Sequence, residues 1–431
     1  MATTIEIRPG YAQIPVGSAA VNYAAVTVHP DLAVQRRATV QLGLVIDTSG
    51  SMDGLIHGRF SPKKIDLVRD AAQRVIGQLS DGDYVTVVAF SDRVQVLAFA
   101  QQVTADRSKL LRAVGNLRAN GGTLMGDGIA GALRELRNLP NPEAAVRKLV
   151  VLTDGQTNDE PHCYQLAEQT DVPFMLGGIG DDYNGALLNE MARSSRGIAE
   201  YIDRPELVQD FFGEVMATVE ATVITNATLN MEFRQRFRPI RAHAVVPELK
   251  SFEFNPPVSP TNRRTSVTLG DIQKDGLTLL VQYAYEGGAG FANEFQVASL
   301  DLTYDMPPQT GLSVHSDDFT VLLGDQPGFP PLDPVVKGYI DHAEVETTQT
   351  RLLNAARTGD VSAATRQLDN LQQNLERVGA DQSFIQQTVQ TMRLTLQNTG
   401  DAGQIADSSA TKRLTSGTRK LSLPPQEQQD Q

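Results

Sequence analysis

The hydrophobic and polar positions at the start of the chain follow a β pattern. Over residues 3–30, apolar and polar residues alternate in short runs, and the apolar phase slips by one residue between Tyr23 and Val26. Either a β-bulge or burial of the strand on both faces would explain this slip. Two or three short strands are not stable alone, so we expect them to pair with strands later in the chain.

From residue 41 onward, buried strands alternate with helices. Continuous apolar runs at 41–47, 84–90 and 148–154 predict buried strands, and the apolar period of 62–79 predicts a helix that covers them. Such an alternation is typical of a mostly parallel sheet with helices on both faces. We therefore predict an α/β doubly wound, Rossmann-like domain over residues 38–220.

The pattern returns to β after this domain. Residues 221–330 contain short alternating runs separated by Pro, Gly and Asn, which is typical of an antiparallel β-sandwich. The strands of residues 1–37 are the natural missing partners of this sandwich. The α/β domain would then be inserted into the β-sandwich, which requires that its two ends lie close together.

The last part of the chain is first helical and then polar. Apolar seams over 361–378 and 385–396 predict an antiparallel helical hairpin, within a helical bundle that covers residues 335–400. Residues 401–431 are rich in Gln, Ser, Thr, Asp and Pro, so we expect a disordered tail there.

Composition narrows the class of protein. The chain has 431 residues, of which 41% are hydrophobic and 21% charged, as in ordinary globular proteins. Its net charge of −13 argues against binding to nucleic acid or to anionic membranes. The single cysteine, Cys163, favours a reducing compartment, and neither a signal-peptide pattern nor an apolar run of membrane-spanning length is visible. We therefore expect a soluble, cytoplasmic protein.

Oxygen-bearing side chains follow two of the predicted strands and one glycine-rich turn. Asp47, Ser49 and Ser51 follow the first buried strand, Thr123 follows two glycines, and Asp154 ends a third buried strand. Ligand sites in such sheets lie beyond the carboxyl ends of the strands, and hard oxygen donors suit Mg²⁺, Mn²⁺ or Ca²⁺. Helix capping would explain a single Asp-x-Ser, but five matched positions favour a metal site.

This motif, on this alternation of strands and helices, resembles a prokaryotic-type von Willebrand factor A (VWA) domain with an intact metal-ion-dependent adhesion site (MIDAS). The resemblance covers about residues 40–220. It implies that Ser49, Ser51 and Thr123 bind a divalent ion, Mg²⁺ first of all, together with Asp47 and Asp154. One coordination position would stay open for an Asp or Glu of a partner protein. Because neutral hydroxyl ligands leave the ion electrophilic, an external carboxylate would be strongly attracted.

Further residues are candidates for contact with partners. Around the metal site we expect the partner to touch Met52, Gly122 and Gln156. The basic stretch 411–421 is either a solvated run of charge or a short linear motif for a second partner. In the second interpretation the motif is phosphorylated or bound at its threonines, Thr411, Thr415 and Thr418.

Three functions are compatible with these features. The leading interpretation is a non-enzymatic, metal-dependent adaptor or scaffold in the cytoplasm. The resemblance implies work beside an AAA+ ATPase, or beside a kinase or phosphatase in a stress or defence module. A secreted or surface adhesin would share the site, but the missing secretory signal opposes it. A metal-dependent hydrolase is the third interpretation, and it lacks a visible base beside the site.

Overall fold

The structure, a computed structural model, forms two compact units. One unit contains residues 35–225 and 305–310, and the other contains residues 1–34, 226–304 and 311–431. The structure describes residues 3–17, 19–33, 38–56, 61–104, 106–140, 145–154, 156–180, 183–257, 259, 262–288, 293–324, 328–406 and 408–421.

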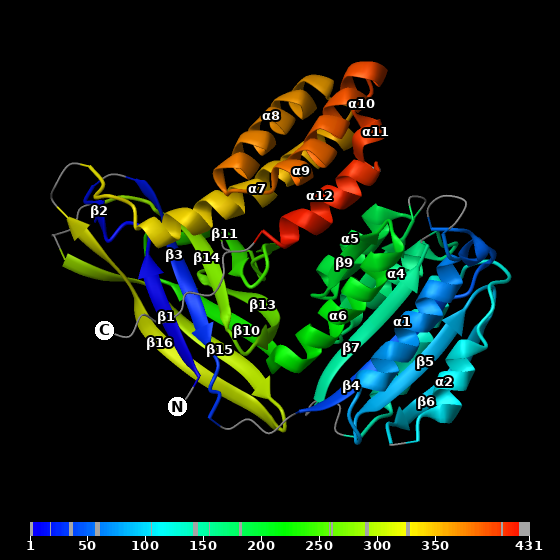
Figure 1. Ribbon diagram of the computed structural model, residues 1–431. Coiled ribbons are helices and arrows are strands. Elements are labelled where there is room, and N and C mark those ends of the chain that lie inside the picture. The colour runs from blue at the N-terminus through cyan, green and yellow to red at the C-terminus, as the bar shows by residue number, and fades with distance from the viewer. Residues whose placement is uncertain are drawn as a thin grey trace. The chain divides into compact units, whose positions relative to one another are not determined.

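The first unit is built on a six-stranded sheet (Figure 1). All neighbouring strands are parallel except β5 and β6, which form an antiparallel hairpin. The central strands are buried almost throughout, which explains why the sequence there is nearly continuously apolar. The order in the sheet is β6 (Val94–Gln102), β5 (Tyr84–Phe90), β4 (Thr39–Asp47), β7 (Ala145–Thr153), β8 (Phe174–Ile179) and β9 (Ile198–Ile202).

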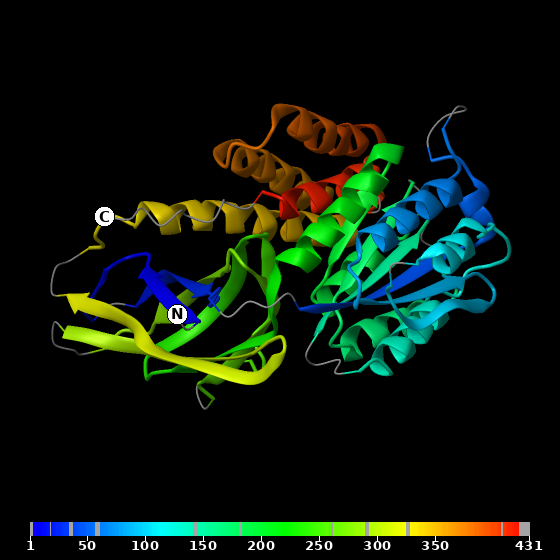
Figure 2. The ribbon, with the colours of Figure 1, turned by 60° about the horizontal axis from the view of Figure 1, so that its bottom comes forward.

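Helices cover both faces of this sheet, as Figure 2 shows. One face packs against α1 (Lys64–Gln78), α2 (Ser108–Gly115) and α6 (Pro205–Ala221). The other face packs against α3 (Met125–Arg137), α4 (Glu160–Gln169) and α5 (Gly185–Ser194). This is the predicted doubly wound arrangement. The connections run in opposite directions from β4 and β7, so the carboxyl ends of these two strands border a crevice suited to a ligand.

The second unit contains two five-stranded sheets. The ring of Phe319 on β16 lies 5.3 Å from the ring of Tyr283 on β14, so the two sheets pack face to face. The first sheet has the order β1 (Thr4–Pro9), β3 (Ala20–His29), β14 (Leu277–Tyr285), β11 (Phe237–Val246) and β12 (Lys250–Phe252). The second has the order β13 (Arg264–Gln273), β10 (Thr222–Phe233), β15 (Asn293–Met306), β16 (Gln309–Gly324) and β2 (Gln13–Pro15).

Strand β3 explains the one-residue slip in the apolar pattern between Tyr23 and Val26. It pairs continuously with β1 on one side and β14 on the other, so the N-terminal strands do pair with later ones. Ala24, Ala25 and Val26 are buried in succession. Ala25 belongs to an apolar cluster with Val336 and Tyr339 of helix α7 (Pro334–Arg357). The slip therefore reflects burial on both faces of β3 rather than a bulge.

The rest of this unit is helical, and its helices share one apolar core. The Asp360 carboxylate accepts a hydrogen bond from the backbone N–H of Ala363 and caps the second helix, as its sequence position suggests. After α7 come α8 (Val361–Arg377), α9 (Gln382–Ile385), the π-turn η3 (Gln386–Gln390), α10 (Thr391–Thr399), α11 (Gly403–Ala406) and α12 (Ser409–Arg419).

The expectation of a disordered tail over 401–431 is wrong for the part of the tail that the structure describes. Ala410 and Leu414 of α12 are at most 1% exposed and join the helical core. The backbone N–H of Leu249, in the loop between β11 and β12, donates to the carbonyl of Arg419 at the end of α12. The segment is polar on average, but Ala410 and Leu414 are spaced so that they lie on one face of a helix. Residues 422–431 lie outside the described part.

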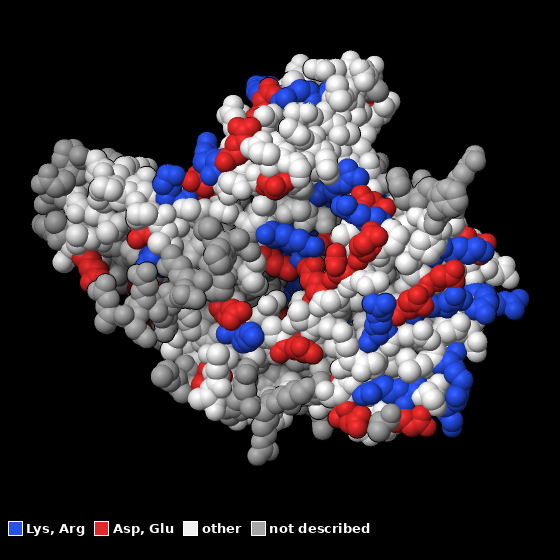
Figure 3. Space-filling view, viewed as in Figure 1, with Lys and Arg blue, Asp and Glu red and all other residues white. Residues whose placement is uncertain are grey.

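No helix within the described ranges is long and apolar enough to cross a membrane. Among the described residues on the face shown in Figure 3, basic and acidic side chains are interspersed.

Candidate metal-binding site

Asp47 lies at the carboxyl end of β4, with its side chain fully buried. Its Oδ1 accepts a hydrogen bond from the backbone N–H of Ser49 at 2.8 Å, and its Oδ2 accepts one from Thr153 Oγ1 at 2.7 Å. Burial raises the pKa of Asp47 to about 6, although these hydrogen bonds favour the ionised form. The carboxylate is thus held in a fixed position with little solvation, a state that a nearby cation would stabilise.

Hydroxyl groups link the ends of β4 and β7. Ser49 Oγ lies 3.0 Å from Ser51 Oγ, and Ser51 Oγ donates to Asp154 Oδ1 at 2.8 Å. Asp154 directly follows β7 and is 6% exposed, whereas Ser51 is exposed. Four of the five residues expected to bind metal are therefore brought together at the crevice, with one side open to solvent.

Thr123 lies on the loop that is bonded to this group. The backbone N–H of Gly50 donates to the carbonyl of Gly121 at 3.0 Å, which joins the two loops. Gly121 has φ +88°, and a Cβ there would lie 2.6 Å from Asp92 Oδ1, so only glycine fits this turn. Thr123 follows two residues later and is half-buried. It therefore lies on the loop next to this group, and its role as a ligand stays a prediction.

A third charged group at the site, beside Asp47 and Asp154, was missed from the sequence. Lys64 Nζ lies 2.9 Å from Asp154 Oδ2, and the two side chains are 10% and 6% exposed. Helix α1 begins at this residue, not at residue 62. A lysine in the first turn faces the positive end of the helix dipole, which is unfavourable without an acidic neighbour. A lysine at a helix start was therefore the feature of the sequence that could have indicated an acidic partner for Lys64.

The expected contacts around the site divide into two groups. Gly122 and Gln156 are exposed, as a contact with a partner requires. The expectation for Met52 is wrong, because its side chain is fully buried in the apolar core beside α1. Met52 turns into the domain, whereas its neighbours Ser51 and Asp53 are exposed.

The expectation of accessible threonines in the tail is wrong for Thr411 and Thr418. Thr411 and Thr418 on α12 are 5% and 2% exposed, so neither a kinase nor a partner can reach their hydroxyls in the folded chain. Thr415 accepts a hydrogen bond from Gln349 Nε2 of α7 at 2.9 Å. Thr411 and Thr418 are thus buried within the helical part of the chain, whereas Thr415 is half-buried.

A second cluster with metal-binding atoms lies at the start of α3 and α4. His162 Nδ1 is 3.5 Å from Asp127 Oδ1 and 4.0 Å from Asp159 Oδ2. The adjacent Cys163 is buried, and its burial together with Asp159 raises the pKa of its thiol. A buried thiol with a raised pKa is not an activated nucleophile.

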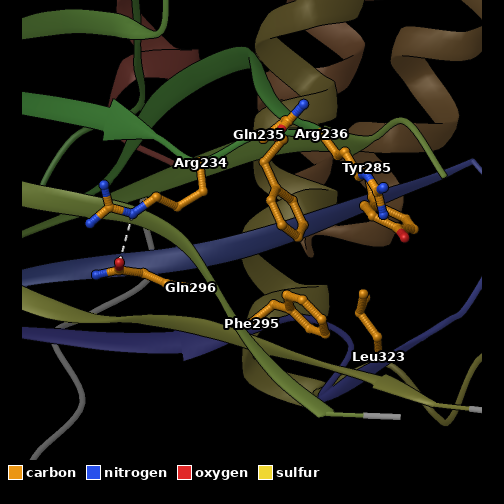
Figure 4. Close-up of a pocket in the computed structure, with 8 residues that line it drawn as sticks. Arg234, Gln235, Arg236, Tyr285, Phe295, Gln296 and Leu323 are labelled. Carbon is orange, nitrogen blue, oxygen red and sulfur yellow. Dashed lines mark hydrogen bonds between the residues drawn. The ribbon is translucent and has the colours of Figure 1, made fainter. Parts of the chain in front are cut away.

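A pocket of about 540 Å³ lies in the second unit (Figure 4). Arg234 points toward Gln296, and its Nε donates to Gln296 Oε1 at 2.7 Å. Among the described residues that line this pocket there is no carboxylate, a donor that hard divalent cations prefer. These residues are Arg234, Gln235, Arg236, Phe237, Tyr285, Phe295, Gln296 and Leu323.

The sheet order and the loops at the ends of β4 and β7 agree with the class of domain suggested by the sequence motif. The family model of the von Willebrand factor type A domain matches residues 42–214. The chain therefore contains a VWA domain.

Proteins that are similar in sequence match different shares of the chain. A Synechocystis protein described as uncharacterized protein sll0103 is 26% identical over 305 residues, which cover 69% of each chain. Inter-alpha-trypsin inhibitor heavy chain H4 from Sus scrofa is 30% identical over 190 residues, but these span only 19% of that protein and 40% of this chain. The similarity to the inhibitor chain is thus limited to a segment.

Solved structures resemble the whole chain. A von Willebrand factor type A protein from Catenulispora acidiphila has a TM-score of 0.73 at 19% identity and covers 97% of both chains. The ArnB paralog VWA2 from Sulfolobus acidocaldarius has a TM-score of 0.58 at 15% identity, with 98% of this chain and 100% of that chain covered. At these identities the similarity is one of fold.

Proposed function

We propose that this protein is a non-enzymatic, metal-dependent adaptor that binds other proteins. A divalent ion, Mg²⁺ in the first place, is held by Asp47, Ser49, Ser51, Thr123 and Asp154, and it accepts an acidic side chain of the partner. The proposed setting is the cytoplasm, beside an AAA+ ATPase or a kinase or phosphatase in a stress or defence module. The VWA domain supports this proposal because such domains serve generally in protein interaction.

One observation carries the proposal. The hydroxyl of Ser51 lies within hydrogen-bond distance of both Ser49 Oγ and Asp154 Oδ1, so donors from two strand ends meet at one point. All of these donors are hard oxygens, and hydroxyls and carboxylates are the ligands that Mg²⁺ and Mn²⁺ prefer. Because Ser51 is exposed, a group from outside can approach the same point.

The chemistry of the donor set fits such an ion. The buried carboxylates of Asp47 and Asp154 supply negative charge for such an ion. When bound, the ion would supply a Lewis-acidic centre for an external carboxylate. The chain's own hydroxyls would orient that centre without neutralising it.

The proposal includes an architecture. The VWA domain is inserted between β3 and β10 of a β-sandwich, and a helical bundle follows the sandwich. The continuous pairing of β3 with β14 supports this arrangement, since strands on both sides of the insertion then share one sheet. The VWA domain would present the metal site while the second unit serves as the scaffold.

A stability measurement tests the metal site. In the EDTA-treated protein, Mn²⁺ or Mg²⁺ at about 100 times its Kd should stabilise the fold by about 2.7 kcal/mol. Asp154→Ala should lose this gain. Asp127→Ala, which removes an exposed aspartate of α3, is the matched control and should keep it. Equal gains in wild type and Asp154→Ala would contradict the assignment.

A further inference from the structure

The ammonium of Lys64 lies among the candidate metal ligands, although it is itself a cation. Its Nζ is 2.9 Å from Asp154 Oδ2, while Asp154 Oδ1 accepts the hydrogen bond from Ser51. One carboxylate therefore joins the lysine to the chain of hydroxyls. A Cβ on Gly180, which follows β8, would lie 3.4 Å from Nζ, so the backbone at this strand end also confines the ammonium.

This lysine is placed against two electrostatic preferences. Burial removes its ammonium from water, and its position at the start of α1 puts it at the positive end of the helix dipole. The preceding residue, Lys63, pairs instead with Asp53 on the surface, where the side chains are 47% and 61% exposed. A buried ion pair adds little net stability. The burial of Lys64 beside Asp154 therefore points to a role for its charge in the site.

We infer that Lys64 sets the charge of the metal site so that the loaded site accepts one carboxylate. This inference rests on the proposed function. The two ionised carboxylates, Asp47 and Asp154, contribute −2, and Lys64 contributes +1. A divalent ion brings the total to +1, which one external carboxylate neutralises. Without Lys64, the two aspartates alone would balance the ion, and the attraction for a partner's Asp or Glu would be weaker.

Two opposite effects follow from this balance. Lys64 repels a divalent ion, so it weakens metal binding. The same charge strengthens the binding of an anion to the loaded site. A charge within about 4–6 Å changes the proton affinity of a carboxylate by about 10- to 1000-fold. We expect the metal and the carboxylate affinities each to change by about tenfold or more, in opposite directions, when the charge is removed.

The experiment uses the full chain and three variants. Lys64→Met removes the charge at similar length, Lys64→Arg retains it, and Lys63→Met removes the neighbouring exposed charge as the matched control. Calorimetric titration with Mn²⁺ measures the metal affinity. Broadening of the ¹³C carboxyl signal of acetate by protein-bound Mn²⁺ then measures the carboxylate affinity of the loaded protein.

Lys64→Met should bind Mn²⁺ about tenfold more tightly and acetate about tenfold more weakly than wild type. Lys64→Arg should restore both affinities toward wild type, and Lys63→Met should leave both unchanged. If Lys64→Met does not fold, Lys64→Gln, which keeps a hydrogen-bond donor for Asp154, makes the same comparison.

Two results would overturn the inference and leave the proposed function standing. One is equal Mn²⁺ affinity in wild type and the uncharged variant. The other is tighter Mn²⁺ binding with unchanged acetate affinity, because Lys64 would then only compete with the metal and would not set the charge of the loaded site. Absence of Mn²⁺ binding in wild type would overturn the proposed function itself.

Discussion

Replacing Asp47 by Asn should stabilise the metal-free protein and abolish its response to Mn²⁺. Asp47 is fully buried, and this burial raises its pKa from 3.8 to about 6. At about 1.36 kcal/mol per pKa unit, the ionised carboxylate costs the metal-free fold on the order of 3 kcal/mol. The asparagine side chain carries no charge, while its amide oxygen can still accept the hydrogen bond from the backbone N–H of Ser49.

The pH dependence of this cost follows from the direction of the shift. Between pH 3.8 and about 6, the folded state holds a proton on Asp47 that the unfolded state has already released. The contribution of Asp47 to stability therefore falls as the pH rises through this window. Above about pH 6 the full cost is present, and below pH 3.8 it disappears. Asp47→Asn should remove this dependence.

Urea unfolding of EDTA-treated protein at pH 8 and near pH 4 measures the effect. At pH 8 the free energy of unfolding of Asp47→Asn should exceed that of wild type by on the order of 3 kcal/mol, and the gap should nearly close at pH 4. Asp210→Asn, at an exposed position of α6, should show no such gap. Lower stability of Asp47→Asn at pH 8, or an equal gap at both pH values, would refute the reasoning.

Three further predictions concern the second unit. Leu414→Ala on α12 should cost about 2–5 kcal/mol in urea unfolding, because the side chain is fully buried, and a cost near zero would mean a detached tail. Deletion of residues 3–29 should unfold the β-sheets, since β3 lies inside a sheet, and an unchanged circular dichroism spectrum would argue otherwise. Burial raises the pKa of Glu346, but hydrogen bonds from His243 and Ser251 lower it below 4.5 overall. Its contribution is therefore present above pH 4.5 and lost as the pH falls through the folded pKa, so Glu346→Gln should destabilise the protein at pH 7 more than at pH 3.

The strand ends that carry the candidate metal site could be predicted from the sequence, because the local pattern of residues and the geometry of a parallel sheet lead to the same arrangement there. Each apolar run that ends in Asp or Ser predicts a buried strand followed by a polar loop, and parallel strands bring those loops to one edge. The pairing of Ser51 with Asp154 follows from this rule. The pairing of Lys64 with Asp154 could not be predicted in this way, because no pattern along the chain indicates which carboxylate a lysine at a helix start will contact.

The remaining errors share one cause. Met52 lies among polar loop residues, and Leu414 lies in a basic, threonine-rich stretch, so composition placed both at the surface. Both side chains are fully buried because the tertiary fold provides an apolar neighbour for them: the core beside α1 for Met52 and the helical core for Leu414. A single apolar residue in a polar segment does not reveal whether such a neighbour exists.

Anomalous X-ray scattering from crystals soaked in Mn²⁺ tests the central claim most directly. The account predicts a peak bounded by the oxygens of Asp47, Ser49, Ser51, Thr123 and Asp154, at distances of about 2.0–2.3 Å from those that bind directly. The same soak of Asp154→Ala should show no peak there. A peak only at the cluster of Asp127, Asp159 and His162, or no peak at the ends of β4 and β7, would contradict the account.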